Sequence, residues 1–201
     1  MIAIVDYDAG NMLSVVKALA HLNEEPVITR DVLVLRSADK IILPGVGAFG
    51  DAMARLGELG LVDVIREVID AGKPFLGICL GLQLLYERSD EAPGVEGIGA
   101  LKGSIRLIPK GEYRKIPHMG WNSLRFPNRG KLFKGIDEGA YVYFVHSYYL
   151  VADDRHSVTA TTDYNVSIDA SVESGNVFAC QFHPEKSGEV GLAILKNFID
   201  L

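Results

Sequence analysis

The first half of the chain alternates short apolar strands with amphipathic helices, and this rhythm constrains the fold more than any other feature. The pattern predicts strands at 2–5, 26–29, 40–43 and 74–78. It predicts helices from an N-cap at Asn11, then over 50–56, 61–71 and 80–88. Strands that alternate with helices indicate a mostly parallel sheet covered on both faces, with its ligand site at the carboxyl ends of the strands.

The second half has a different texture, because its β-type segments follow one another without intervening helices. Several of them alternate apolar and polar residues, which is typical of antiparallel strands with one face in water. A final helix is predicted from about residue 189. We find no repeat or linker in the 201 residues, so we expect one α/β domain over 1–201, an open sheet with antiparallel strands added in its second half. The segments are 104–108, 122–126, 141–145, 158–161, 168–172 and 176–182.

A cysteine lies between glycines where a predicted strand turns into a predicted helix, in Gly77-Ile78-Cys79-Leu80-Gly81. Nucleophile elbows have this strand-turn-helix pattern, and glycines permit the tight turn and close backbone approach that an elbow needs. The helix N-terminus behind the sulfur favours the reactive thiolate. Free cysteines are also common as inert core residues, so Cys79 alone leaves both interpretations open. Cys180 lies inside an apolar strand, and there we expect core packing.

The segment His183-Pro184-Glu185 follows the last strong strand. A histidine can take the proton of a thiol and return it to a leaving group, and an acidic partner fixes its tautomer. On its own the segment also fits an ordinary strand end at the surface. Together with the elbow at Cys79, it predicts a triad of Cys79, His183 and Glu185.

Residues 44–50 contain G-x-G-x-x-G between a strand and a helix, as in the dinucleotide fingerprint. That fingerprint needs an acid at the end of the next strand, whereas Asp63, Glu67 and Asp70 lie within a predicted helix. The glycines fit an oxyanion hole better, with the N–H groups of Val46 and Leu80 as its donors.

Composition excludes several classes of function. A net charge of −6 without a basic run argues against nucleic acid as a partner. We find neither an apolar run of the roughly 20 residues that span a bilayer nor a signal peptide. Two cysteines form no disulfide framework, which indicates the cytoplasm. No cluster has the spacing of metal ligands, so we expect no metal and no cofactor.

Residues 77–83 (Gly-Ile-Cys-Leu-Gly-Leu-Gln) and 182–185 (Phe-His-Pro-Glu) resemble the motifs of class I (triad-type) glutamine amidotransferases. Four further segments resemble, within that family, the glutaminase subunits of imidazole glycerol phosphate synthase. The resemblance runs from the first strand to the final helix. The segments are 6–11 (Asp-Tyr-Asp-Ala-Gly-Asn) with Ser14-Val15, 43–49, 115–122 (Lys-Ile-Pro-His-Met-Gly-Trp-Asn) and 143–148 (Tyr-Phe-Val-His-Ser-Tyr).

The resemblance implies that Cys79 attacks the side-chain amide of glutamine and forms a glutamyl thioester, which water hydrolyses to glutamate. It implies that Gly47, Gln83, Ser147 and Tyr148 bind the substrate. It also implies a heterodimer in which ammonia passes to a (β/α)₈-barrel cyclase subunit for histidine biosynthesis. The residues that would face this partner are Asn11, Trp121, Asn122, Tyr143 and Lys186.

Two alternatives stay open. The chain could be the glutaminase subunit of another class I amidotransferase, although residues 118–122 and 143–148 argue against this. It could also be a non-catalytic regulatory module with a vestigial elbow, and the intact Cys79, His183 and Glu185 argue against that.

Overall fold

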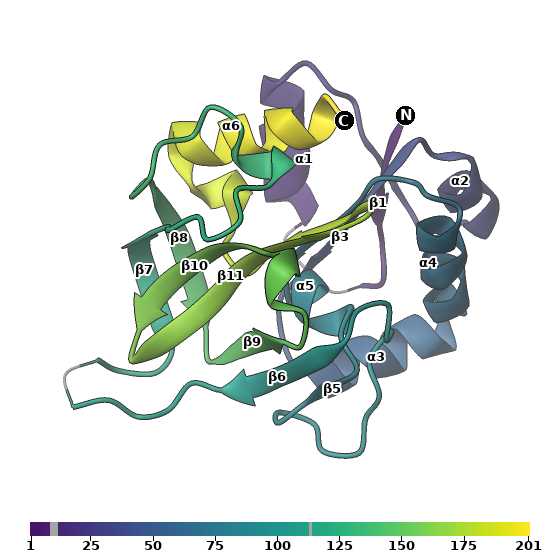
Figure 1. Cartoon of the computed structure of the whole chain (residues 1–201). Coiled ribbons are helices and arrows are strands. Elements are labelled where there is room, and N and C mark those ends of the chain that lie inside the picture. Colours follow the sequence, from purple (N-terminus) through teal and green to yellow (C-terminus); the bar gives the residue numbers. More distant parts are fainter. Residues whose placement is uncertain (9–11, 113) are drawn as a thin grey trace.

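The computed structural model describes residues 1–8, 12–112 and 114–201, and centres on a large mixed sheet with helices on both faces (Figure 1). In space the strands follow the order β2-β1-β3-β4-β12-β11-β9-β6-β5, and β10 pairs with β11 beside this path. The strands are β1 (Ile2–Val5), β2 (Val27–Thr29), β3 (Lys40–Gly45), β4 (Phe75–Cys79), β5 (Arg88–Ser89), β6 (Gly103–Leu107), β9 (Tyr148–Ala152), β10 (Val158–Tyr164), β11 (Val166–Ser174) and β12 (Val177–Cys180).

A separate antiparallel hairpin stands beside the sheet and consists of β7 (His118–Ser123) and β8 (Tyr141–His146). The helical elements are α1 (Met12–His21), α2 (Val32–Ser37), α3 (Phe49–Glu58), α4 (Leu61–Asp70), α5 (Leu80–Leu84) and α6 (Gly188–Ile199), with the 3-10 turns η1 (Lys131–Phe133), η2 (Arg155–Ser157) and η3 (Pro184–Lys186).

The sheet has a parallel half and a largely antiparallel half, as the sequence predicts. Strands β2, β1, β3 and β4 pair in parallel, whereas β11, β9 and β6 pair antiparallel. Strand β12 joins the halves, because it runs parallel to β4 and antiparallel to β11. The predicted open α/β sheet is therefore confirmed.

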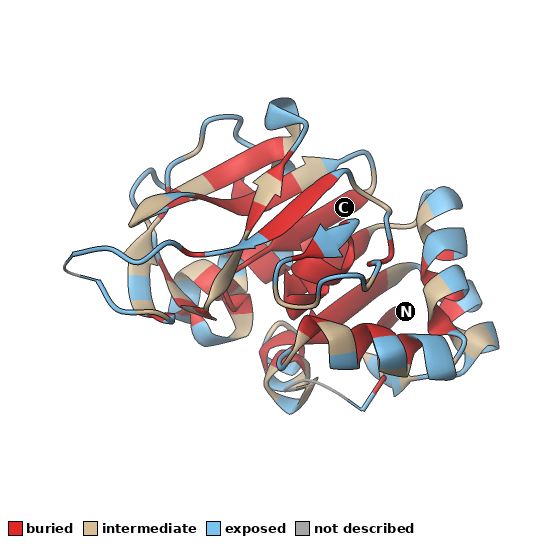
Figure 2. Cartoon of the chain, turned by 90° about the horizontal axis from the view of Figure 1, so that it is seen from below, coloured by how far each residue is buried: buried red, intermediate tan, exposed pale blue. Residues whose placement is uncertain are grey.

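Two hydrophobic cores lie on opposite faces of the sheet, because alternate residues of each buried strand point to opposite sides. In β1, Ala3 and Val5 belong to the core under α2, α3 and α4, whereas Ile2 and Ile4 belong to the core under α1 and α6. Figure 2 shows the buried strands in red between helices whose outer surfaces are blue. Burial on both faces explains why these strands are apolar throughout.

Some element boundaries differ from the prediction. The predicted helix over 80–88 ends at Leu84, because the carbonyls of Leu84 and Leu85 accept the N–H groups of Ile98 and Leu101 in place of a further helical turn. The predicted strand over 122–126 is displaced to His118–Ser123. Arg125 comes two residues after the end of β7 and no longer pairs with β8. It exchanges hydrogen bonds with Thr161 of β10 instead.

Helix α2 and strand β9 are the longest of the elements that were not predicted, which also include β5 and the 3-10 turns. The run Val-Leu-Val-Leu in α2 has β-type composition, yet Asp31 caps a helix there by accepting the N–H of Leu33 at 2.8 Å. Strand β9 directly follows β8 and continues its apolar pattern, so the sequence gives little sign of the break between them.

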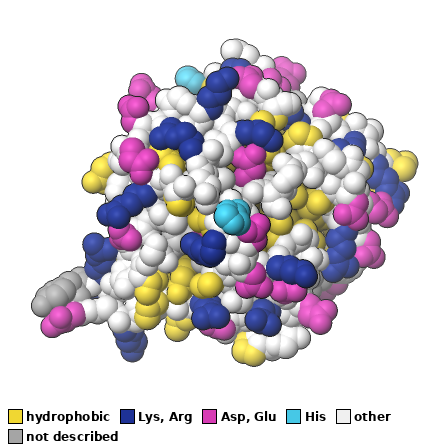
Figure 3. All heavy atoms as spheres, in the orientation of Figure 1, with side chains coloured by type: hydrophobic (Ala, Val, Ile, Leu, Met, Phe, Trp, Pro, Cys, Tyr) yellow, Lys and Arg dark blue, Asp and Glu magenta, His cyan; other side chains and the backbone are white. Residues whose placement is uncertain are grey.

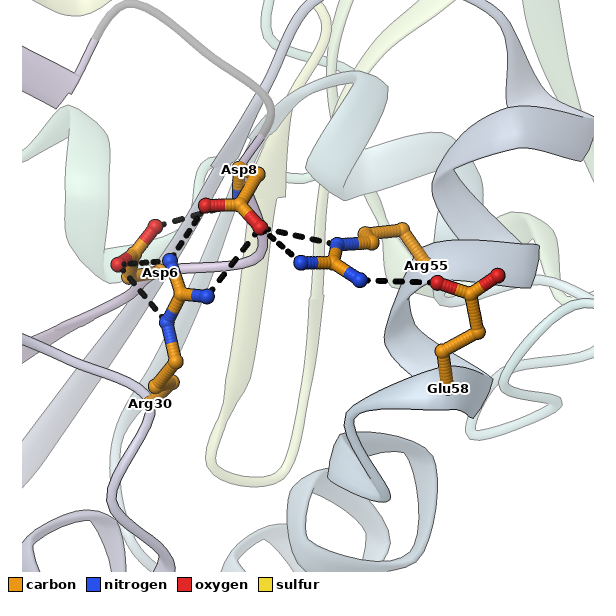
Figure 4. Close-up of polar contacts among 5 residues, drawn as sticks. All are labelled: Asp6, Asp8, Arg30, Arg55 and Glu58. Atoms are coloured by element: carbon orange, nitrogen blue, oxygen red, sulfur yellow. Dashed lines mark hydrogen bonds and ion pairs between the residues drawn. The ribbon is translucent and has the colours of Figure 1, made fainter.

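An ion-pair network fixes the chain just after β1 (Figure 4). Asp8 has a φ of 62° and forms ion pairs with both Arg30 and Arg55. Arg30 also pairs with Asp6 at 2.6 Å, and Arg55 with Glu58 at 2.9 Å. The two guanidinium groups lower the pKa of the Asp8 carboxyl to about 2. The network joins the end of β1 to α3, which begins next to the predicted oxyanion loop.

Acidic and basic side chains are interspersed on the face shown in Figure 3, as the modest net charge leads one to expect. Within the described residues, no helix is both long enough and apolar enough to cross a membrane.

Candidate active site

The nucleophile elbow is built by close packing around a strained cysteine. Cys79 ends β4 and precedes α5 with φ 54° and ψ −107°, outside the regions that L-residues normally occupy. The positive φ thus belongs to Cys79 and not to its flanking glycines. Those glycines are needed for space, since a Cβ at Gly77 would lie 2.8 Å from the Gly81 carbonyl oxygen, and one at Gly81 would overlap the Leu43 carbonyl.

His183 and Glu185 form a buried pair. His183 Nδ1 lies 2.8 Å from Glu185 Oε1, and both side chains are almost fully buried. The turn η3 begins at Pro184 and returns Glu185 toward the ring, while the His183 N–H donates to the Tyr143 carbonyl. Within the described chain, His183 Nε2 has no hydrogen-bond partner. This nitrogen is therefore free for proton transfer.

Cys79 and His183 line one cavity of about 400 Å³. Burial lowers the pKa of His183, but the favourable interactions with Cys79 and Glu185 outweigh it and raise that pKa to about 9. The imidazole is therefore protonated near neutral pH and can stabilise a neighbouring thiolate.

The predicted oxyanion residues lie beside the cysteine. Gly45 pairs in register with Cys79, so Val46 and Gly47 follow directly next to the elbow, and both line the cavity with Leu80. The buried Tyr7 hydroxyl donates to the Pro44 carbonyl at 2.9 Å and anchors the strand before this loop.

All four predicted substrate residues line the same cavity: Gly47, Gln83, Ser147 and Tyr148. The Gln83 side-chain amide donates to the Tyr148 carbonyl at 3.2 Å and to Gln181 Oε1 at 3.1 Å. It therefore supports the wall of the cavity in this structure, and its contact with substrate stays a prediction.

Sequence reasoning missed several residues of the site: Glu91, Pro117, Val145 and His146 also line the cavity, and Gln181 contacts the cysteine. Gln181 is fully buried, and its Nε2 donates to Cys79 Sγ at 3.6 Å. A polar side chain within the apolar run at 177–182 was the available signal. Glu91 lines the cavity and accepts the Phe49 N–H at 2.8 Å through Oε2. It lies in an irregular loop, where the sequence carries no periodic signal.

The predicted partner-facing residues divide into two groups. Trp121 and Tyr143 are opposite each other in the hairpin, with ring centroids 6.2 Å apart, and Trp121 is 56% exposed. Lys186 is exposed in η3. Asn122 belongs to the other face of the hairpin, where its amide reaches His118 and the Asp163 carbonyl. Asn11 lies outside the described residues.

Two further expectations concern the cysteines and metals. Cys180 is fully buried in the core, as predicted. In residues 1–8, 12–112 and 114–201 we find no group of three His, Cys, Asp or Glu residues that could hold a metal ion.

Comparison with known proteins agrees with this geometry. Residues 3–201 match the family model of the glutamine amidotransferase class-I family. The "Imidazole glycerol phosphate synthase subunit HisH" of Moorella thermoacetica is 52% identical over 200 residues, covering 100% of this chain and 94% of the relative. The subunit of that name from Aquifex aeolicus is 52% identical over 196 residues, covering 97% of this chain and 94% of the relative.

Solved structures show the same fold. The crystal structure of a glutamine amidotransferase superposes with a TM-score of 0.78 at 19% identity, covering 100% of this chain and 98% of the other. The structure of PurLQS from Thermotoga maritima superposes with a TM-score of 0.73 at 26% identity, covering 99% of this chain and 97% of the other. The chain therefore belongs to the glutamine amidotransferase class-I family.

Proposed function

We propose that this chain is the glutaminase subunit of imidazole glycerol phosphate synthase and supplies ammonia to a (β/α)₈-barrel cyclase subunit. One observation carries the catalytic part of the proposal: a strained Cys79 shares a cavity with the free Nε2 of a buried His183–Glu185 pair. The full-length similarity to HisH subunits supports the choice of synthase.

In the first half of the reaction, the Cys79 thiolate attacks the side-chain amide carbon of glutamine. The N–H groups of Val46 and Leu80 stabilise the resulting oxyanion. The carbon–nitrogen bond then breaks, and the leaving nitrogen takes the Nε2 proton of His183 and departs as ammonia.

In the second half, neutral His183 removes a proton from water, which attacks the glutamyl thioester. The carbon–sulfur bond breaks, glutamate leaves and the thiolate–imidazolium pair is restored. Glu185 holds Nδ1 throughout, so that Nε2 always faces the reacting atoms.

The cavity fits an amino acid substrate. Glu91 places a carboxylate in its wall, which complements the ammonium group of glutamine. We propose that Gly47, Gln83 and the backbone at Ser147 and Tyr148 bind the rest of the molecule.

We propose that the cyclase subunit covers the outer face of the β7–β8 hairpin and forms a one-to-one heterodimer. Trp121 and Tyr143 pair on this face, and Lys186 is exposed on the neighbouring η3. The start of α6, just after η3, lies close to the tryptophan, since a Cβ at Gly188 would be 3.9 Å from the Trp121 ring. A docked partner would thus lie close to the segment that carries His183.

Labelling with an electrophilic glutamine analogue tests this function. In the presence of the cyclase subunit, mass spectrometry should find one adduct, on Cys79, with simultaneous loss of glutaminase activity. Cys180 serves as the internal control, because its thiol is fully buried and burial raises its pKa, so it should stay unmodified. An active complex with unmodified Cys79 would contradict the proposal. Failure of the cyclase subunit both to bind and to raise glutaminase activity would exclude this synthase and leave another amidotransferase.

A further inference from the structure

Two histidines outside the triad are buried together at the wall of the glutamine cavity, and His146 is one of the residues that line it. His118 is on β7 and His146 ends β8; they are 2% and 6% exposed, and the distance from His118 Nδ1 to His146 Nε2 is 3.0 Å. The His118 ring is stacked between Phe144 and Tyr164, with centroid distances of 4.6 Å and 4.0 Å. The mechanism above uses neither ring.

The hydrogen bonds around this pair can run in only one direction. His146 Nδ1 lies 2.8 Å from the Tyr148 carbonyl oxygen, which can only accept, so Nδ1 carries the hydrogen. The Nε2 of a neutral His146 must then accept from His118 Nδ1. His118 Nε2 is left as an acceptor for the amide of Asn122 at 3.3 Å.

Asn122 fixes that direction at its other end. Its Oδ1 accepts the N–H of Ser123 at 2.9 Å, and its Nδ2 also donates to the Asp163 carbonyl at 3.1 Å. The amide is therefore oriented with its nitrogen toward His118. Neutral rings are required as well: burial, with the nearby Arg114, lowers the pKa of His118 to about 4. Burial lowers the pKa of His146 to about 3, although the Tyr148 carbonyl opposes it.

The Tyr148 carbonyl connects this series of hydrogen bonds to the nucleophile. It accepts from His146 Nδ1 and also from Gln83 Nε2. Gln83 donates in turn to Gln181, whose amide reaches Cys79 Sγ. Ser147 and Tyr148, which form the cavity wall, are thus held at the point where two lines of hydrogen bonds meet.

We propose that the His118–His146 pair is a positioning unit of the glutamine site, which fixes the wall at Ser147 and Tyr148 through one defined tautomer of each ring. This inference rests on the proposed function and adds two residues to it. Since the pair holds the wall of the cavity, to which His146 itself belongs, it governs the binding of glutamine more than the chemical step.

The test compares His118→Phe with His118→Asn in the complex with the cyclase subunit. Phenylalanine retains the stacking between Phe144 and Tyr164 but removes the donor to His146, whereas asparagine can restore an N–H near the position of Nδ1. Leaving a buried acceptor unpaired should raise the KM for glutamine roughly ten-fold in His118→Phe, with kcat nearly unchanged. In His118→Asn, the KM for glutamine should return most of the way to the wild-type value.

Tyr164→Phe is the matched control. It removes a hydroxyl that donates to the Lys115 carbonyl but retains the ring stacked on His118, so its KM should equal that of the wild type. A His118→Phe variant with wild-type KM would overturn the proposal. A rise in KM that is equally large in His118→Asn, or that also occurs in Tyr164→Phe, would overturn it as well.

Nitrogen-15 NMR of the histidine rings gives a readout without activity. Near pH 6.5 both rings should be neutral and protonated at Nδ1; protonation at Nε2 of either ring would overturn the proposal. A wild-type complex that hydrolyses no glutamine would instead contradict the proposed function, and the NMR spectrum would still decide the tautomers.

Discussion

At the scale of single residues, the proton on His183 decides which steps the site can perform. The ring is nearly fully buried, and burial alone would make it neutral, yet Cys79 and Glu185 raise its pKa from 6.5 to about 9. In the proposed mechanism, Nε2 holds this proton at neutral pH and delivers it to departing ammonia. The same interactions stabilise the folded chain, since a raised pKa contributes stability that is full below about pH 6.5 and is lost as the pH rises through about 9.

This raised pKa predicts the alkaline limit of activity. With saturating glutamine and the cyclase subunit, kcat should fall as the pH rises through about 9, because His183 then loses the proton that ammonia needs. The conservative Glu185→Gln variant should move this fall to lower pH, since it removes one of the two groups that raise the pKa. A plateau of kcat that extends unchanged past pH 10 in both proteins would contradict this assignment.

At the scale of elements, the elbow depends on how closely α5 approaches β3. Gly81→Ala would place a methyl group against the Leu43 carbonyl, so α5 must shift. We expect a loss of about 1–3 kcal/mol in the free energy of unfolding and a large fall in glutaminase activity, measured by denaturant unfolding and steady-state assay. Gly57→Ala is the control: it lies in α3 with open space around it, so it should retain activity and stability. Equal behaviour of the two variants would contradict the argument.

The elements also show what the sequence can predict. The parallel half, the elbow and the His183–Glu185 turn were predictable from local signals. These signals are the hydrophobic periodicity, the spacing of the glycines around Cys79 and the His-Pro-Glu motif. The early end of α5 was not, since it depends on the distant amides of Ile98 and Leu101. The displacement of β7 depends equally on a pairing with β10 that only the folded chain creates. Glu91 joins the site through a tertiary contact and has no local signature. His118 and His146 lie in segments that carry the family resemblance, but only the fold shows that the two rings meet.

At the scale of the whole molecule, the active site forms where the two halves of the sheet meet. Strand β4 delivers Cys79 and strand β12 leads to His183, and the two strands are parallel neighbours, so their carboxyl ends reach the same edge. The β7–β8 hairpin stands at this edge and turns its buried face, with His118 and His146, toward the site. Its outer face carries the exposed Trp121, which leaves a surface for a partner directly beside the catalytic groups.

This arrangement predicts that one aromatic side chain contributes much of the binding to the cyclase subunit. Trp121→Ala should weaken the complex roughly 30-fold, or about 2 kcal/mol, because a large exposed ring that becomes buried is a typical hot spot. Titration calorimetry with the cyclase subunit measures the Kd. Leu33→Ala on α2 is the control, since Leu33 is 73% exposed and belongs to a helix against the parallel half of the sheet. We place the partner beside the segment that carries His183, so a weaker complex should also lower the glutaminase activity of Trp121→Ala. An excess of the cyclase subunit that saturates this variant should restore that activity. An unchanged Kd for Trp121→Ala would show that the partner docks on another face.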